Sequence, residues 1–156
     1  MFDIKKYTGV WHEIFKIPFE WDPGCNAVTA EYQVIGENKL SVKNTCYFSA
    51  QDFYSRTGIV VEDNQEYKNN DQVEKRLIVE FTDGLPAGPP GPYWIHWTDY
   101  QFSVVGGPTR DQLWLLARKP EIDAGILQDF VTYVSTLGYN IDRVRLSNNV
   151  TVVSTE

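Results

Sequence analysis

The chain has 156 residues, 14% of them aromatic, and a formal net charge of −7, which is enough for one domain with a sizeable core. The acidic balance excludes a nucleic-acid-binding protein, because such proteins need a basic face to displace counterions, and it disfavours electrostatic attachment to anionic membranes. The sequence has neither a run of about 18 apolar residues nor a secretory signal after Met1, so we expect no transmembrane helix and either an intracellular protein or one numbered from after a removed segment.

Strand-like runs separated by turn residues dominate the chain. Those at 26–35, 39–49 and 75–81 alternate apolar with polar side chains, which is typical of a sheet with one buried face. Short connections join the runs, which implies antiparallel neighbours in an up-and-down meander. The eight strands that we expect, in chain order, are 10–17, 26–35, 39–49, 54–62, 75–81, 93–98, 102–105 and 112–118.

One amphipathic helix is expected after the eighth strand. Glu121 and Asp123 supply acidic residues for its first turn, and Gly138 supplies the stop. The apolar positions that recur at helical spacing are Ile122, Ile126, Phe130 and Val134. We expect the helix to pack on the outside of the sheet and a short ninth strand to follow at 144–146. No second domain or repeat is indicated, so we interpret 1–156 as a single domain.

Three motifs stand in order on the expected strands. Gly9-x-Trp11 opens the first strand, Thr98-Asp99-Tyr100 lies at the turn between the sixth and seventh strands, and Arg118 ends the eighth. Together they resemble the three motifs of the lipocalin family. The chain is most similar to the group that contains bacterial lipocalins, apolipoprotein D and plant temperature-induced lipocalins. The resemblance implies an all-β fold, an eight-stranded antiparallel up-and-down β-barrel (calyx) with one C-terminal α-helix packed on the outside.

The physical reading of these motifs is structural. In such a barrel the first strand starts, and the eighth ends, at the same rim, so Trp11 and Arg118 should meet there. A guanidinium stacked on the indole stabilises a fold by roughly 0.5 to 2 kcal/mol. Here it would seal the closed end of the barrel. The residues that we assign to this structural motif are Gly9, Trp11, Thr98, Asp99, Tyr100 and Arg118.

Strand parity selects the inner wall of the expected barrel. In the eighth strand, Arg118 determines which alternate residues face inward. In the sixth strand, the alternate residues that are more apolar, which include Trp97, are assigned to the inside. The expected ligand-binding residues are Val28, Tyr32, Val42, Leu77, Val79, Tyr93, Ile95, Trp97, Trp114 and Leu116. The family resemblance also implies pocket roles for Tyr93 and Trp114. Side chains that merely fill the barrel are the alternative for each residue, but the wall as a whole matches sites for apolar ligands.

The loops at the mouth suggest an apolar lip formed by Phe19, Trp21 and Leu85, with Arg110 as a candidate for an anionic head group. The Pro-rich loop 83–92 is interpreted as a stiff lip. Its position resembles that of a membrane-linked loop in plant temperature-induced lipocalins, so weak membrane contact is the alternative. We expect a monomer or a weak dimer.

Two cysteines do not make a disulfide framework. A hairpin turn near 36–38 would pair residues whose numbers add up to about 75. Cys46 would then face Thr29 rather than Cys25. This favours two free thiols, with a bulge in the register as the alternative that would change the pairing.

The sequence favours a binding protein over an enzyme. His12 and His96 should point outward from strands that are not neighbours, so we expect neither a metal site nor a catalytic pair, and no cofactor. The first hypothesis is a non-enzymatic carrier of a fatty acid, lysophospholipid or similar small hydrophobic ligand. The alternatives are an isomerase or epoxide-handling enzyme that uses Cys46 or Glu13, and an interaction module with a filled barrel.

Overall fold

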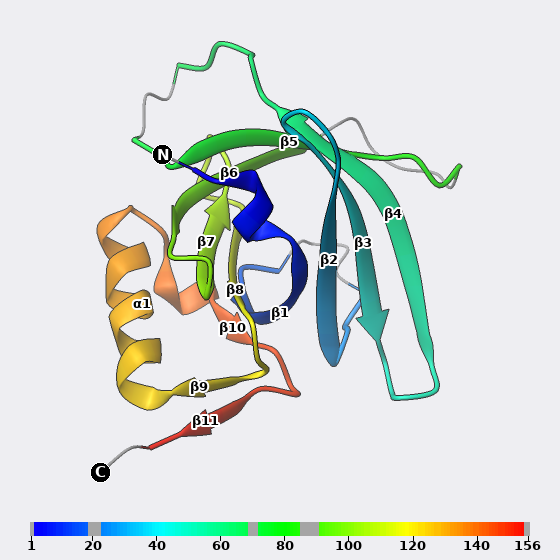
Figure 1. Ribbon diagram of the computed structural model, residues 1–156. Coiled ribbons are helices and arrows are strands. Elements are labelled where there is room, and N and C mark those ends of the chain that lie inside the picture. The colour runs from blue at the N-terminus through cyan, green and yellow to red at the C-terminus, as the bar shows by residue number, and fades with distance from the viewer. Residues whose placement is uncertain (1, 19–22, 69–71, 85–90, 155–156) are drawn as a thin grey trace.

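The computed structural model describes residues 2–18, 23–68, 72–84 and 91–154, and it is a closed antiparallel barrel (Figure 1). Each strand pairs antiparallel with the next, and the first pairs with the eighth. The expected fold and strand order are therefore confirmed. The barrel strands are β1 (Gly9–Lys16), β2 (Ala27–Gly36), β3 (Lys39–Tyr47), β4 (Phe53–Glu62), β5 (Lys75–Phe81), β6 (Gly91–Thr98), β7 (Phe102–Gly106) and β8 (Leu113–Ala117).

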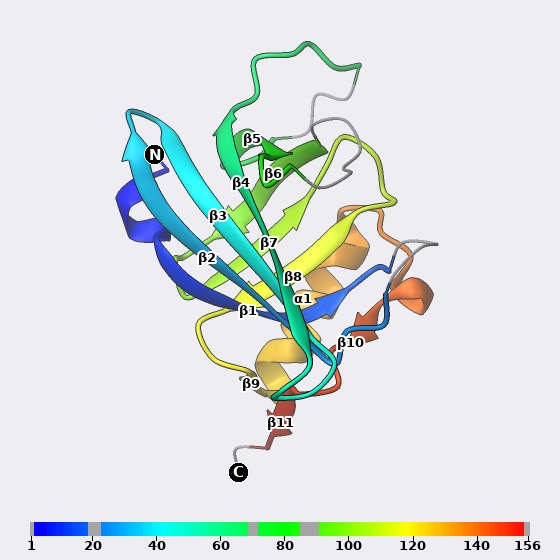
Figure 2. The ribbon, with the colours of Figure 1, turned by 90° about the vertical axis from the view of Figure 1, so that its right-hand side faces the viewer.

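A single-turn 3₁₀ helix (Ile4–Tyr7) precedes the barrel and crosses in front of it in Figure 1. The α-helix α1 (Ala124–Thr136) begins one residue after its N-cap, Asp123, whose carboxylate accepts from the Ile126 N–H at 3.1 Å. The turn that we expected to be helical is instead β9 (Glu121–Asp123), because β11 (Thr151–Val153) pairs with it in parallel. Figure 2 shows β9 and β11 side by side near the C-terminus. Within the described residues, no helix is long and apolar enough to span a bilayer.

One edge of β1 pairs with β8 and closes the barrel, whereas its other edge is shared between two partners. Its first half, from Gly9 to His12, pairs with β2. Its end pairs with β10 (Arg145–Leu146), close to the ninth strand that the sequence predicts. The C-terminal segment therefore covers the part of β1 that β2 leaves.

Two clusters of buried side chains lie on opposite faces of the barrel wall. The inner cluster fills the barrel around Trp11, whereas the outer cluster packs β1, β7 and β8 against α1. Val134 is the fully buried residue of α1. The helix thus covers the outside of the barrel, as its amphipathic pattern predicts.

A β-bulge at His96 overturns one of the parity assignments. Ile95 pairs with Val105 but Trp97 pairs with Val104, so β6 carries one extra residue between these pairs. An extra residue shifts every later side chain to the opposite face. Trp97 therefore belongs to the outer cluster, where its ring lies 5.7 Å from that of Phe130. The prediction that Trp97 lines the barrel is wrong.

The two cysteines form a disulfide, so the expectation of free thiols is also wrong. The β2–β3 register places Cys46 opposite Val28, one position from the expected partner. However, β2 begins only at Ala27, and Cys25 lies just before the ladder with its Cα 5.4 Å from that of Cys46. The register therefore does not constrain Cys25, which reaches Cys46 from outside the strand.

We expect the Cys25→Ser/Cys46→Ser double variant to lose about 3 kcal/mol of unfolding free energy, because the bond closes a loop with a sequence separation of 21. Denaturant unfolding with and without a reductant measures this loss. Reductant should destabilise the wild type and leave the double variant unchanged. Equal stabilities for the two proteins would show that the bond contributes nothing.

Candidate functional site: the barrel interior

The closed end of the barrel is sealed by an indole beneath a guanidinium. Trp11 is fully buried, and the Arg118 guanidinium lies 3.8 Å from the centre of its ring system. Arg118 also donates to three backbone carbonyls, those of Lys6, Val10 and Tyr100, at 3.0 to 3.1 Å. These bonds tie the 3₁₀ helix, β1 and the β6–β7 turn to the end of β8.

The β6–β7 turn is built by side-chain hydrogen bonds to its own backbone. The Asp99 carboxylate accepts from the N–H groups of Gln101 and Phe102 at 2.9 and 2.8 Å, and the Thr98 hydroxyl donates to the Phe102 carbonyl at 2.7 Å. Tyr100 adopts a positive φ of 69°, and its hydroxyl accepts from the Asp3 N–H at 2.7 Å. The turn therefore holds the N-terminal segment over the closed end.

Above the indole, four hydroxyl groups form a continuous hydrogen-bonded chain. Tyr32 donates to Tyr93 at 2.8 Å, the Tyr93 and Tyr7 hydroxyls are 2.8 Å apart, and those of Tyr7 and Ser103 are 2.7 Å apart. The rings of Tyr7 and Trp11 lie 4.9 Å apart, and the Trp11 N–H donates to the Tyr7 carbonyl. The floor of the calyx is thus an aromatic layer with a polar chain through it, which we call the hydroxyl chain.

Burial keeps these phenols neutral. Desolvation raises the pKa of Tyr7 to about 12, and it also raises the pKa values of Tyr32 and Tyr93 well above the usual value for tyrosine. The hydroxyl chain therefore presents O–H groups rather than phenolates across the physiological range.

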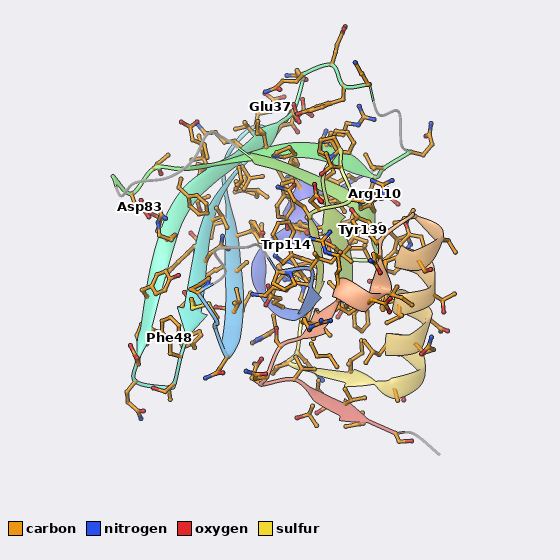
Figure 3. The ribbon with its side chains drawn as sticks, turned by 180° about the vertical axis from the view of Figure 1, so that it is seen from behind. Glu37, Phe48, Asp83, Arg110, Trp114 and Tyr139 are labelled. Atoms are coloured by element: carbon orange, nitrogen blue, oxygen red, sulfur yellow. A yellow bond between two sulfur atoms is a disulfide. The ribbon has the colours of Figure 1, made fainter. Side chains whose placement is uncertain are left out.

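The structure brings most of the predicted wall residues together. Tyr32, Val42, Leu77, Ile95 and Leu116 lie buried in the inner cluster. Val79, Tyr93 and Trp114 pack against that cluster while keeping part of their surface accessible. Val28 is half-buried on β2 opposite Cys46. Figure 3 shows Trp114 near the centre, between the β3–β4 side and α1.

Strand β4 adds inner-face residues that sequence reasoning did not assign. Val60 belongs to the inner cluster, and alternation places Arg56 on the same face of β4. Arg56 donates to both carboxylate oxygens of Asp83, at 2.7 and 3.2 Å, and lies 4.8 Å from the Phe81 ring centre. Arg56 and Gly58 interrupt the alternation of apolar residues in this strand. The sequence pattern therefore did not show which residues of β4 face inward.

Arg110 does not lie where we expected an anion-binding group. Its Nε donates to the Leu137 carbonyl at the end of α1 at 2.7 Å, and its guanidinium lies 5.1 Å from the Tyr139 ring centre. Figure 3 places Arg110 and Tyr139 on the side of α1. The expected role at the mouth is therefore replaced by a helix contact. The expected lip residues Phe19, Trp21 and Leu85 lie outside the described residues.

The histidines do not form a metal site in the described part of the chain, where no group of three or more metal-ligating side chains occurs. His96 points away from the inner wall, as predicted, but it is buried rather than exposed. Its Nε2 lies 3.0 Å from the Tyr139 hydroxyl. A Cβ at Gly106 would lie 2.1 Å from that hydroxyl, so this contact requires glycine. Desolvation lowers the pKa of His12.

The two side chains proposed for catalysis are both engaged. Cys46 is bonded to Cys25 and therefore offers no thiol to a substrate. Glu13 is buried, accepts from the Ser147 hydroxyl at 2.9 Å, and has Lys16 at 3.9 Å. Its carboxylate is held by the C-terminal segment that covers β1.

A cavity of about 360 Å³ lies at the closed end, between the N-terminal segment, the β2–β3 turn and the start of β5. Phe2, Ile4 and Leu77 supply apolar lining, with Lys5 and Lys75 at its edge. Leu77, one of the predicted wall residues, also belongs to the inner cluster.

A closed meander barrel with an apolar and aromatic inner wall and one outer helix defines a calyx-type barrel protein. A model of the lipocalin-like domain matches residues 2–149. A putative lipocalin of Acanthamoeba polyphaga mimivirus is 31% identical over 145 residues, 91% of this chain and 82% of the relative. Mouse apolipoprotein D is 30% identical over 152 residues, 92% of this chain and 75% of the relative. Lobster apocrustacyanin matches in structure with a TM-score of 0.69 at 15% identity, covering 98% of this chain and 81% of that one.

The chain belongs to the lipocalin family. Lipocalins bind small hydrophobic ligands in the barrel calyx, so the inner wall described above is the candidate site of this protein.

Proposed function

We propose that this protein binds and carries a small hydrophobic ligand, such as a fatty acid or a lysophospholipid, in the calyx and without chemical conversion. The observation that carries the proposal is the partial accessibility of Val79, Tyr93 and Trp114 within an otherwise buried inner cluster. Apolar and aromatic side chains that retain accessible surface on a concave wall are typical of ligand sites.

The wall favours an acyl chain for energetic reasons. Each methylene group that it buries contributes about 0.8 kcal/mol, so a long chain gains enough to bind without a charged partner. The floor ends in neutral hydroxyls and an indole, which offer no counter-ion to a carboxylate. A fatty acid would therefore enter tail first and keep its head group at the mouth.

The structure supports binding better than the enzymatic alternatives. A thiol-dependent reaction requires a free cysteine, whereas Cys46 is in a disulfide. Glu13 accepts from the Ser147 hydroxyl and has Lys16 at 3.9 Å, so its carboxylate is already engaged by the protein itself.

Titration with a fluorescent fatty acid tests the proposal, with native mass spectrometry to identify any co-purified lipid. We expect saturable binding that weakens about a hundredfold in Trp114→Arg, because roughly 3 kcal/mol of apolar contact is lost and a charge enters the wall. Ile35→Arg is the matched control, since Ile35 is exposed on β2. The absence of saturable binding to the wild type would exclude the carrier function for this ligand class.

A further inference from the structure

We propose that Arg56 and Asn44 form an anion-binding subsite on the inner wall of the calyx, near its mouth, and that this subsite holds the charged oxygen group of an amphipathic ligand. The group that it recognises is a carboxylate or a phosphate, which a fatty acid or a lysophospholipid would supply. This inference rests on the proposed carrier function and names the residues that determine its head-group specificity.

The strand register turns both side chains into the barrel. Asn44 on β3 pairs with Arg56 on β4, in a ladder that is regular along its whole length. On the same two strands, Val42 and Val60 belong to the inner cluster, and side chains two or four positions apart share a face. Because β1 starts at the closed end and each strand runs antiparallel to the next, β3 ends and β4 starts at the mouth. Asn44 and Arg56 therefore continue the inner face toward the mouth.

The inner wall becomes accessible at the level of this pair. Closer to the closed end, Leu40, Val60 and Leu77 have at most 1% of their surface exposed. Nearer the mouth, the Arg56 side chain keeps 23% of its surface accessible and its guanidinium is not buried, while Tyr54 on the same face is 43% exposed. An inward-facing side chain is reached only from the lumen or the mouth, so a ligand that enters the calyx can contact the Arg56 guanidinium.

The groups that hold Arg56 in place use only part of its hydrogen-bonding capacity. Its Nε and Nη2 donate to the two carboxylate oxygens of Asp83 at 2.7 and 3.2 Å, and the guanidinium lies 4.8 Å from the centre of the Phe81 ring. Asp83, which Figure 3 shows at the end of β5 beside β4, also accepts from the Thr57 N–H at 3.2 Å. A guanidinium has five N–H donors, so the edge formed by Nη1 and the second Nη2 proton has no partner among the described residues. A carboxylate or phosphate can accept from such an edge with two oxygens.

Asn44 supplies a further donor beside this edge. Its side chain is half-buried on the inner face, and its amide makes no hydrogen bond to the described residues. Opposite residues of a ladder have Cβ atoms about 4.5 to 5.5 Å apart, so the amide and the guanidinium can reach the same ligand group. Ala30, which pairs with Asn44 on its other side, has only a methyl group and leaves room for that group. One anion would therefore satisfy both the amide and the free edge of Arg56.

Asp83 limits how tightly the subsite holds an anion. Its carboxylate offsets the charge of Arg56, so an incoming anion gains less than it would from an unpaired guanidinium. Removing the two partners should therefore change the affinity for anions in opposite directions. Loss of the Arg56 charge should weaken anion binding, whereas loss of the Asp83 charge should strengthen it.

Two pairs of probes with the same lauroyl chain separate the head groups. The first pair is the fatty acid and its methyl ester, and the second is lysophosphatidic acid and the corresponding monoacylglycerol. Calorimetric titration below the critical micelle concentration measures each affinity. In at least one pair we expect the anion to bind about tenfold more tightly than its neutral partner, the lower end of the effect of a charge-assisted hydrogen bond. The pair that shows this preference identifies the head group as a carboxylate or a phosphate.

Four variants assign the preference to individual charges. Arg56→Gln should abolish it and leave the affinity for the neutral probes unchanged, whereas Asp83→Asn should raise the affinity for the anion about threefold, the effect of one partly exposed charge. The Arg56→Gln/Asp83→Asn double variant carries neither charge and should bind both members of a pair equally. Lys43→Gln is the matched control, because Lys43 precedes Asn44 on β3 and is exposed on the outer face, so its loss should leave the preference intact.

The outcomes separate this inference from the carrier function. If the probes bind but neither anion is preferred, or the double variant or Arg56→Gln keeps the preference, the assignment to Arg56 is wrong while the carrier function stands. A preference that disappears in Lys43→Gln would reflect the net charge of the protein and would also overturn the assignment. If Arg56→Gln does not fold, Asp83→Asn decides, and an affinity for the anion that does not rise there contradicts the inference. If no probe binds to the folded wild type, both proposals fail.

Discussion

Replacing Trp11 by alanine is expected to lower the free energy of unfolding by about 3 to 5 kcal/mol, the cost of removing a large buried aromatic side chain. Trp11 is fully buried, and its N–H donates to the Tyr7 carbonyl at 2.9 Å. The substitution also removes the surface on which Arg118 and the Tyr7 ring pack. Because a protein of this size has roughly 5 to 15 kcal/mol of stability, the variant should unfold at a much lower denaturant concentration.

Two matched variants show which part of the indole matters. Trp11→Phe keeps an aromatic face under Arg118 but loses the N–H, so it should lose less than the alanine variant. Val10→Ala changes the neighbouring residue, which is exposed on the other face of β1, and should shift stability little. If Trp11→Ala unfolded at the same denaturant concentration as Val10→Ala, the indole would not be what seals the closed end.

The strand order could be predicted because it depends on local signals. Alternation, turn residues and short connections fix eight antiparallel neighbours without any long-range information. The predicted β5, at 75–81, has the bounds that the structure shows. The start of α1 was placed too early, because Glu121 and Ile122 pair with residues of β11 that lie 30 positions later in the chain and leave no local signal.

Parity assignments failed where the backbone departs from a regular ladder. The alternation of residues along β6 predicts that Trp97 faces inward, but the bulge at His96 turns its side chain outward. No residue type in the stretch around His96 marks a bulge, since the nearest glycine is Gly91. The disulfide escaped prediction for a related reason, because Cys25 lies before β2, where register carries no information.

The floor of the site was the least predictable part. Tyr7 lies in a single-turn 3₁₀ helix with no periodic pattern, yet it contacts Tyr93 and Ser103, which are more than 80 residues away in the chain. Such contacts exist only once the barrel has closed. The motif residues Trp11 and Arg118 do indicate the end of the barrel at which this cluster forms, but not its hydrogen bonds.

Stability and the proposed ligand binding would both depend on this floor. Arg118 covers Trp11, Trp11 packs on Tyr7, and Tyr7 is linked to Tyr93 through their hydroxyls. The packing that closes the barrel therefore also positions the hydroxyl chain. A substitution at the closed end should change ligand affinity even though it contacts no ligand.

The same cluster should make the protein unfold in alkali. Unfolded tyrosine loses its proton near pH 10, whereas desolvation raises the pKa of Tyr7 in the folded protein to about 12. Between these values the unfolded chain binds fewer protons than the folded one, so stability falls as pH rises. Ionisation of Tyr7 alone should lower the free energy of unfolding by about 2 kcal/mol at pH 12. Tyr32 and Tyr93, whose pKa values are also raised by burial, add to the loss.

Free energies of unfolding measured from neutral pH to pH 12 check this expectation. In Tyr7→Phe the slope between pH 10 and 12 should be shallower by about 1 kcal/mol per pH unit, since most of one proton is lost from the unfolded chain but not from the folded protein in this range. Ser103→Ala removes the hydrogen bond to Tyr7 without removing an ionisable group, so it should lower stability at every pH and keep a slope close to that of the wild type. A wild type whose stability does not change between pH 10 and 12 would show that these phenols ionise as easily in the folded protein as in the unfolded chain, and that the hydroxyl chain is open to solvent.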